Sequence, residues 1–525
     1  MRHLSNKKLF GAAAVAFLLV LQGCSSQTLR VAPHTELKVF DPIWTTAYIT
    51  RDHGYLVYDT LFSMNEMYEP EPQMVDTWSV SADKTLWTFQ LREGLKWHDG
   101  KDVTAEDCIA SLQRWGKRDG LGQLLFRDIE SLSANDAVTF EMKLKRPNAA
   151  VLQMLAKLSS NVPFMMPKRL AQSDPFTAIQ DPIGSGPFIF SKDEWVPGSK
   201  VVYVKNKKYI PRKEPVSLAA GGKVAKLDRI IWKFYPDQTS ATQALIDGEV
   251  DYMESPSTKM IPLLEGKKEI TLAFTDPSGN VAMSRFNTLL PPFDDVAVRR
   301  AAIMAMDQSD YMTAALGDPK YWRTCYSVFP CGTQFESEVG NELMKIGNIE
   351  AAKKALQATS YDGTPVVILN PVDSPVISAM TQVTVNKLRE IGMVVEVRDM
   401  TWASLTEQRA NRESVANGGW NMFHTWWIAA DLSNPMAIAF SGNRNSGWFG
   451  WPEDAQLEEL RSAFIEAGSE EQAQEIAGKI QARLFDIAAF AVLGQFFEPV
   501  AYSNKVYGVT SPIHFFGNMS FEKPE

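Results

Sequence analysis

The chain has 525 residues, of which 45% are hydrophobic and 11% aromatic, and its formal net charge at pH 7 is -9. This composition excludes bulk disorder, and the length exceeds what one hydrophobic core organises, so we expect two or three domains. The negative charge argues against a nucleic-acid partner, because such partners require clustered cations. The one dense basic cluster, residues 205–213, is interpreted as a solvated turn.

The N-terminus has the pattern of an export signal. Basic residues at positions 2, 7 and 8 precede an apolar run over 9–21, which ends just before Gly23-Cys24. This pattern predicts a signal peptide over residues 1–23, with cleavage before Cys24 and a lipid on the Cys24 sulfur. The alternative is an ordinary signal peptide with an incidental Cys24. We therefore expect a protein of the periplasm or cell envelope, attached to the membrane through Cys24.

The first half of the chain predicts short strands joined by hairpins. Segments 86–91 and 137–142 alternate or run apolar between turn signals. A helix is expected to begin after Thr104, because Thr104-x-x-Asp107 has the form of a capping box. Cys108 shares the apolar face of this helix with Leu112 and Trp115, which predicts a buried free thiol.

The second half predicts α/β structure. Residues 366–369 form an apolar strand, Ser374-Pro375 begins a helix, Gly392 ends it, and 394–397 resume as a strand. This is a βαβ unit with parallel strands. A second long helix is expected to begin at Ser469, with Gln472 at the capping-box position.

Two further cysteines, Cys325 and Cys331, stand six positions apart around a turn that contains proline. In an exported protein this spacing predicts a disulfide. A metal-binding pair is the weaker alternative, because no His or other Cys lies nearby to complete a tetrahedral site.

The templates for catalysis do not fit this sequence. Gly184-Ser185-Gly186-Pro187 lacks the glycine that a nucleophile elbow needs, and Gly221-Gly222-Lys223-Val224 lacks the upstream glycine and the hydroxyl residue of a phosphate loop. The six histidines include no pair with zinc spacing. The sequence therefore predicts a protein that is not an enzyme, with no catalytic residues, no cofactor and no metal site.

Recognition chemistry is concentrated in segment 423–435. Two adjacent indoles, Trp426 and Trp427, precede a single carboxylate, Asp431. A ligand with an ammonium group and an apolar body would find an ion pair and aromatic walls there. The alternative is a core strand whose tryptophans pack inward while Asp431 caps the turn before Pro435.

Four segments taken together resemble one family, the extracellular solute-binding proteins of family 5. This family contains the dipeptide, oligopeptide and nickel binding proteins that serve ABC importers. The matching segments begin with Leu91-Arg92-Glu93-Gly94-Leu95-Lys96-Trp97-His98-Asp99-Gly100 and continue at 184–188, 244–251 and 286–301. Their order and spacing cover nearly the whole mature chain.

The resemblance implies an α/β fold: two lobes of the periplasmic-binding-protein type (type II, cluster C like), with an extra β-rich subdomain in lobe one. Lobe one is expected over 24–280, with the small subdomain at about 66–180, and lobe two over 281–497. Residues 498–525 are expected to return to lobe one. The segments Trp97-His98-Asp99-Gly100 and Gly184-Ser185-Gly186 are interpreted as structural turns.

The resemblance also implies ligand-binding residues. Asp431 corresponds to the aspartate that holds the ligand ammonium in dipeptide members, with Trp426 and Trp427 beside it. The first ligand loop is expected over 41–48, where Trp44, Thr46 and Tyr48 are candidates for either the site or the core. Dipeptide members also have an arginine for the ligand carboxylate, but residues 370–380 contain none. Arg51 is a candidate for holding the ligand carboxylate instead. The alternative is that Arg51 is an ordinary arginine exposed on the surface.

By resemblance, we expect a monomeric binding protein that captures a small peptide or another amine-bearing solute and delivers it to an ABC permease. Binding would shift mobile lobes toward a closed state. One alternative is a binder of a non-peptide solute, such as a metal chelate, an opine or a sugar. The other is a secreted hydrolase.

Overall fold

The structure is a computed structural model that describes residues 27–274, 276–467, 469–510 and 513–523. The predicted signal peptide and its Cys24 lie outside these residues. Within the described ranges we find no helix with the length and hydrophobicity that crossing a bilayer requires.

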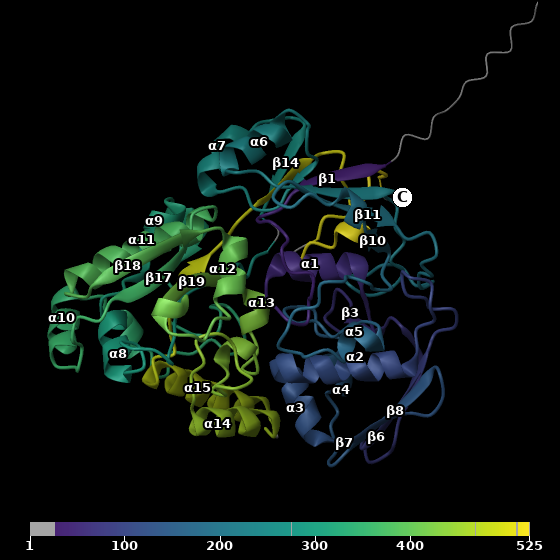
Figure 1. Ribbon diagram of the computed structural model, residues 1–525, viewed down its shortest axis with the longest axis horizontal. Helices are drawn as coiled ribbons and strands as arrows, with labels where there is room; N and C mark the ends of the chain where they lie inside the picture. Colours follow the sequence, from purple (N-terminus) through teal and green to yellow (C-terminus); the bar gives the residue numbers. More distant parts are fainter. Residues whose placement is uncertain (1–26, 275, 468, 511–512, 524–525) are drawn as a thin grey trace, which may run out of the picture.

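A seven-stranded mixed sheet organises one side of the molecule (Figure 1). The N-terminal strand β1 lies near its middle, parallel to both of its neighbours, β12 and β13. The strands, in spatial order, are β10 (Phe188–Phe190), β11 (Lys200–Lys205), β12 (Arg229–Lys233), β1 (Thr28–Ala32), β13 (Tyr252–Met253), β21 (Val500–Ser503) and β14 (Ile270–Ala273).

A separate four-stranded antiparallel sheet lies below it in the same half of the molecule (Figure 1). Its order is β5 (Val75–Val80), β6 (Leu86–Leu91), β8 (Thr139–Leu144) and β7 (Ile129–Ala134). Two small ribbons pair β2 (Asp59–Thr60) with β9 (Phe164–Met165) and β3 (Phe62–Met64) with β4 (Pro70–Pro72). The helices of this half are α1 (Tyr48–Val57), α2 (Ala105–Arg118), α3 (Gly120–Asp128), α4 (Val151–Leu155), α5 (Lys168–Ala171), α6 (Gln238–Ile246) and α7 (Ile261–Leu264).

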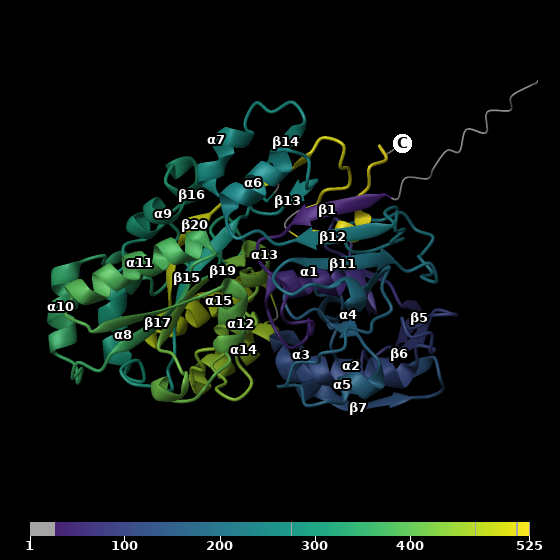
Figure 2. The same ribbon diagram turned by 45° about the horizontal axis from the view of Figure 1, so that its top comes forward.

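The other half contains a six-stranded sheet with helices packed around it (Figure 2). Its order is β16 (Trp322–Arg323), β20 (Phe490–Phe496), β15 (Asn280–Phe286), β19 (Met422–Ile428), β17 (Val366–Pro371) and β18 (Val395–Met400). The helices are α8 (Val296–Met304), α9 (Gln308–Leu316), α10 (Ile349–Gln357), α11 (Pro375–Glu390), α12 (Trp402–Gln408), α13 (Ala429–Leu432), α14 (Ala455–Ile465) and α15 (Glu470–Asp486).

The chain passes between the two halves twice, from β14 to β15 and from β20 to β21. We call the half with the seven- and four-stranded sheets lobe one (27–273 and 500–523) and the other half lobe two (280–496). We propose that the domains divide at these two connections, and that the four-stranded sheet belongs to the extra subdomain of lobe one. Each lobe has its own large hydrophobic core.

The predicted local elements are confirmed. Thr104 and Asp107 form a capping box at the start of α2, and Cys108 is a buried free cysteine. The βαβ unit is β17, α11 and β18, with the two strands parallel. The Ser469 side chain accepts a hydrogen bond from the Gln472 N–H at the start of α15. Cys325 and Cys331 are joined in a disulfide, with their Cα atoms 5.9 Å apart.

The glycines at 184 and 186 have a different role from the tight turn that the sequence predicts. A Cβ atom on Gly184 would lie 1.9 Å from the carbonyl oxygen of Val57, and one on Gly186 would lie 2.7 Å from that of Leu56. Both glycines therefore allow the chain to pass directly against the C-terminal end of α1.

A group of buried charged side chains lies beside the connections between the lobes. Glu254 accepts hydrogen bonds from the backbone N–H of His34 at 3.0 Å and contacts the His34 ring at 2.7 Å and the His514 ring at 3.5 Å. Glu498 lies on the second connection and lines a small cavity together with Glu254 and His514. Burial raises the pKa of Glu498 to about 7; the charge of His34 opposes this rise, and that of Glu254 adds to it.

We expect the variant Glu498→Gln to be more stable than the parent above pH 7 and equally stable near pH 4, below the unfolded-state pKa of the carboxyl. A raised folded-state pKa means that the parent loses stability as the pH rises from about 4.5 to about 7, and the variant lacks this loss of about 3 kcal/mol. Urea unfolding at both pH values measures it, with the exposed Glu396→Gln as the control. An equal effect of Glu498→Gln at both pH values would contradict the expectation.

Candidate ligand-binding site

The predicted first ligand loop, residues 41–48, is held in place by a buried ion pair. Asp41 and Arg114 are both fully buried, and Oδ2 of Asp41 lies 2.6 Å from Nη2 of Arg114. The other carboxylate oxygen accepts hydrogen bonds from the backbone N–H groups of Ile43 and Trp44, at 3.0 and 3.1 Å. The ion pair therefore joins the loop to helix α2, and the turn at Asp41 sets the direction in which the loop continues.

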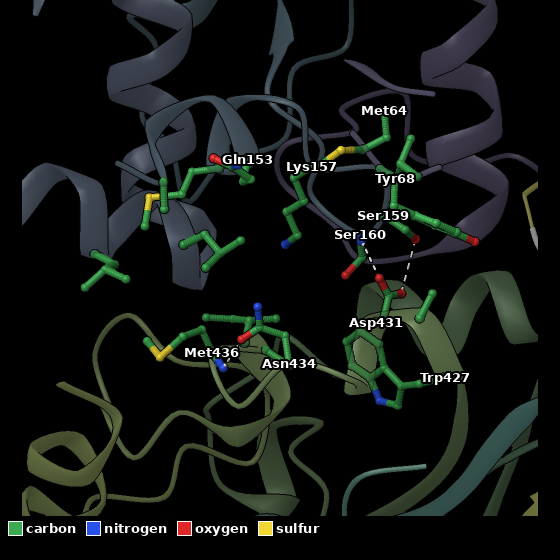
Figure 3. Close-up of a pocket in the computed structure, with 18 of the residues that line it drawn as sticks. Met64, Tyr68, Gln153, Lys157, Ser159, Ser160, Trp427, Asp431, Asn434 and Met436 are labelled. Atoms are coloured by element: carbon green, nitrogen blue, oxygen red, sulfur yellow. Dashed lines mark hydrogen bonds between the residues drawn. The ribbon is translucent and has the colours of Figure 1, made fainter. Parts of the chain in front are cut away.

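Asp431 belongs to lobe two, but its carboxylate binds lobe one. It lies in the short helix α13, directly after strand β19. Its Oδ1 accepts a hydrogen bond from the Ser160 backbone N–H at 2.9 Å, and its Oδ2 accepts one from the Ser159 hydroxyl at 3.2 Å (Figure 3). The alternative in which Asp431 caps its own turn before Pro435 is wrong, because these bonds lead to the opposite lobe.

Tyr48 completes the contact between the lobes. Its hydroxyl donates to Oδ2 of Asp431 at 2.8 Å and accepts from the Ile428 backbone N–H at 2.8 Å. Its ring lies 5.4 Å from the Trp426 ring, and Trp426 packs against the cores of both lobes. Burial and the charge of Asp431 raise the pKa of Tyr48 well above its usual value, so the phenol remains a proton donor.

The first cavity, next to Asp431, has a volume of about 510 Å³ and lies between the lobes (Figure 3). Lobe two contributes Trp427 and Asp431 to its wall, and lobe one contributes Lys157, Ser159 and Ser160. The rest of the wall is mostly apolar and includes Met64, Leu121, Leu124, Met154, Leu218, Met436, Ile438, Phe464, Ile465 and Ile513. An apolar cavity with a few convergent polar groups is typical of a small-molecule site.

The charges of the first cavity leave Asp431 available to a ligand. Burial raises the pKa of the Asp431 carboxyl, while the positive charges of Lys157 and Arg51 lower it. Lys157 itself pairs with the fully buried Asp119. A carboxylate can accept about four hydrogen bonds, and three reach Asp431 from lobe one. One acceptor direction therefore remains for a cationic group in the cavity.

The second cavity has a volume of about 360 Å³ and also lies between the lobes. It contains two of the predicted residues, Trp44 and Thr46, together with Ile438, which it shares with the first cavity. The Thr46 hydroxyl accepts hydrogen bonds from Nε1 of Trp448 at 3.1 Å and from Nη2 of Arg409 at 3.3 Å. The other residues of its wall are Arg118, Asn161, Phe176, Ala410, Arg412, Asn445, Gly447, Trp448, Phe449 and Trp451.

The structure thus brings Tyr48, Trp426 and Asp431 together and places Trp427 on the first cavity, whereas Trp44 and Thr46 face the second. Trp427 is only 3% exposed, so it serves both the core of lobe two and the cavity wall. Sequence reasoning did not identify Lys157, Arg118 or Arg412 as site residues. No local pattern marks them, because they come from three separate segments that only the fold brings together.

The alternative of an exposed Arg51 is wrong. Arg51 is 4% exposed, pairs with Asp52 at 2.8 Å, and donates to the Ser159 hydroxyl at 2.9 Å. Its guanidinium also lies 4.5 Å from the centre of the Tyr48 ring. Arg51 therefore supports the residues that contact Asp431.

Within the described residues there is no group of three or more His, Cys, Asp or Glu side chains that could hold a metal ion.

Comparison with known proteins connects this geometry to a family. Residues 69–448 match the family described as bacterial extracellular solute-binding proteins, family 5 Middle. The chain is 36% identical to a probable peptide ABC transporter periplasmic-binding protein of Sinorhizobium fredii. This alignment extends over 518 residues and covers 96% of this chain and 97% of the relative. It is 24% identical to the dipeptide-binding protein DppE of Bacillus subtilis, over 78% of this chain and 76% of that protein.

Solved structures share the two-lobed fold. The binding protein AgaA of A. tumefaciens R10, in complex with agropinic acid, superposes with a TM-score of 0.76 at 20% identity and covers 95% of this chain and 99% of its own. The binding protein DppA of Helicobacter pylori, in complex with the peptide STSA, gives a TM-score of 0.76 at 20% identity, over 94% and 98% of the two chains. The match over residues 69–448, together with the 36% identical relative, shows that the chain belongs to the bacterial extracellular solute-binding proteins of family 5.

Proposed function

We propose that this protein captures a peptide or a peptide-like amine between its lobes and delivers it to the permease of an ABC importer. The observation that carries the proposal is the position of Asp431, whose carboxylate lines the apolar first cavity at the boundary between the lobes. A ligand ammonium beside Asp431 would form a charge-assisted hydrogen bond, and the ligand's apolar part would contact Trp427. The names of the relatives, one a probable peptide transporter protein and one a dipeptide-binding protein, support this ligand class.

Binding is coupled to closure of the lobes in this proposal. The carboxylate of Asp431 already joins lobe two to Tyr48, Ser159 and Ser160 of lobe one. A ligand that contacts both walls of the cavity adds interactions that exist only when the lobes are together. It therefore shifts the population toward the closed state, and the permease would distinguish the loaded from the empty protein by that state.

Native mass spectrometry of protein purified from its own host, without refolding, tests the ligand class. We expect a co-purified mass that matches a short peptide or another amine, and titration of that compound should reproduce the complex. A co-purified sugar, metal chelate or amine-free solute would contradict the peptide assignment. Turnover of a peptide library by the purified protein would contradict a binding role and favour a hydrolase.

We also propose that the protein resides in the periplasm or cell envelope, as a monomer anchored by lipid on Cys24. The variant Cys24→Ser removes the only sulfur that could carry this lipid in the predicted motif. We expect the parent to sediment with membranes after cell lysis and Cys24→Ser to stay in the soluble fraction. Cys108→Ser is the control that leaves the anchor in place. Equal membrane association of the parent and Cys24→Ser would contradict the anchor.

A further inference from the structure

Arginines without a direct carboxylate partner among the described residues surround the second cavity. Arg118, at the end of α2, approaches it from lobe one, and Arg412 approaches it from lobe two. Arg409 is 2% exposed, and its guanidinium lies 5.4 Å from the Trp448 ring and 4.8 Å from the Phe449 ring, which both line this cavity. Among the described residues, none of these three arginines forms an ion pair with a carboxylate. In contrast, the buried Arg114 pairs with Asp41.

Most donor groups of these arginines are unused. Arg118 donates to the Trp44 carbonyl at 2.7 Å, and Arg412 donates to the Arg444 carbonyl at 2.8 Å. Arg409 has only the 3.3 Å bond to the Thr46 hydroxyl. A guanidinium offers five N–H donors, and the buried Nε atoms of Arg118 and Arg409 have no hydrogen-bond partner. Arg299, a buried arginine with a structural role, instead donates hydrogen bonds to four backbone carbonyls.

Aromatic rings hold the two arginines of the wall in position. The guanidinium of Arg118 lies 5.0 Å from the centre of the Phe176 ring, and that of Arg412 lies 4.9 Å from the Trp451 ring. Stacking of this kind orients the guanidinium but leaves its N–H edge free for a carboxylate. The site is therefore built for a planar anion with two oxygens.

Burial and neighbouring positive charges make these arginines favourable partners for an anion. Burial lowers the pKa of Arg118 to about 10; the charges of Asp41 and Asp174 oppose this change, and those of Arg114 and Arg412 add to it. Burial likewise lowers the pKa of Arg409 to about 9. Both side chains are still charged at neutral pH. Because Arg118 and Arg412 belong to opposite lobes, their repulsion opposes closure until an anion lies between them.

We propose that the second cavity binds a carboxylate group of the ligand, held between Arg118 of lobe one and Arg412 of lobe two. This inference rests on the proposed function, because it assigns a second group of the same ligand. The two cavities share Ile438, and the Trp427 and Trp448 rings that line them lie 5.0 Å apart. The preferred substrates are therefore peptides or amines that also carry a carboxylate, which is either the peptide C-terminus or an acidic side chain.

Isothermal titration calorimetry with four peptides, each in two forms, tests the proposal. It also shows whether the C-terminal or the side-chain carboxylate is recognised. The peptides are Ala-Glu, Ala-Gln, Ala-Ala-Glu and Ala-Ala-Gln, each with a free and with an amidated C-terminus. We expect loss of the recognised carboxylate to weaken binding about tenfold or more. A dependence on C-terminal amidation would identify the terminus, and a dependence on Glu against Gln would identify the side chain.

The variants Arg118→Gln and Arg412→Gln should remove this preference while leaving the affinity for the carboxylate-free peptide nearly unchanged. Arg444→Gln is the matched control, because Arg444 is close to Arg412 but pairs with Glu453 and does not line the cavity. Equal binding of acid and amide forms by the parent would overturn the carboxylate site and leave peptide capture intact. Absence of binding to every member of the series would overturn the proposed function itself.

Discussion

Replacing Asp41 with Asn is expected to lower the free energy of unfolding by about 3–5 kcal/mol, the usual cost of removing one charge from a buried ion pair. Asp41 and Arg114 are both fully buried, so water cannot replace the lost carboxylate charge. Arg114 would keep its hydrogen bonds to the carbonyls of Ser173, Asp174 and Thr177, but its charge would be uncompensated. Chemical denaturation of parent and variant at pH 7 measures the effect.

The matched control for this experiment is Asp102→Asn. Asp102 pairs with Lys96 at the surface, where its side chain is 72% exposed. An exposed pair contributes about 0–1 kcal/mol, so this variant should unfold close to the parent. A similar, small effect of Asp41→Asn and Asp102→Asn would contradict the importance of the buried pair.

The substitution Asp41→Asn should also affect ligand binding. The Asp41 carboxylate fixes the turn that leads into the loop with Trp44, Thr46 and Tyr48. When this turn is less well defined, more of the binding energy is needed to order the loop. We therefore expect weaker binding by folded Asp41→Asn under conditions in which Asp102→Asn binds normally.

The elements that could be predicted from the sequence are those specified by short-range patterns. Thr104 and Asp107 are three positions apart, so a capping box is visible before any tertiary contact is known. In the βαβ unit, Pro375 marks the start of the helix and Gly392, with a φ of 101°, follows its end. The chain order of the two lobes, in contrast, came from resemblance to a family.

The candidate site could be predicted only in part, because its contacts join distant segments. The short spacing between Trp427 and Asp431 in segment 423–435 is enough to predict that the two residues lie close together. The hydrogen bond between Ser160 and Asp431 spans 271 positions, and no periodic pattern indicates it. Arg118 shows the same limit: at the end of a helix it is an ordinary residue, and only the tertiary fold brings it to the same cavity as Arg412. The burial of Arg51 could not be predicted either, because its ion-pair partner Asp52 is adjacent in the sequence and two neighbouring charged residues are typical of an exposed surface.

Replacing Asp431 with Asn is expected to weaken binding of an amine-bearing ligand by about 1.5–3 kcal/mol, which is about 10- to 150-fold in Kd. The variant keeps the shape of the side chain but removes the charge that would pair with the ammonium. Titration of the co-purified ligand, followed by tryptophan fluorescence because Trp426 and Trp427 lie nearby, measures the loss.

A second role of Asp431 must be separated from this one, because its carboxylate also joins the lobes through Tyr48, Ser159 and Ser160. Tyr48→Phe is the matched control: it removes one of these hydrogen bonds and leaves the carboxylate charge in place. We expect Tyr48→Phe to weaken binding of a peptide and of its N-acetylated form by the same small factor. Asp431→Asn should instead weaken the free amine far more than the acetylated form, since only the amine has a charge to lose. An equal loss for both forms would show that Asp431 acts through closure of the lobes and that the ammonium binds elsewhere.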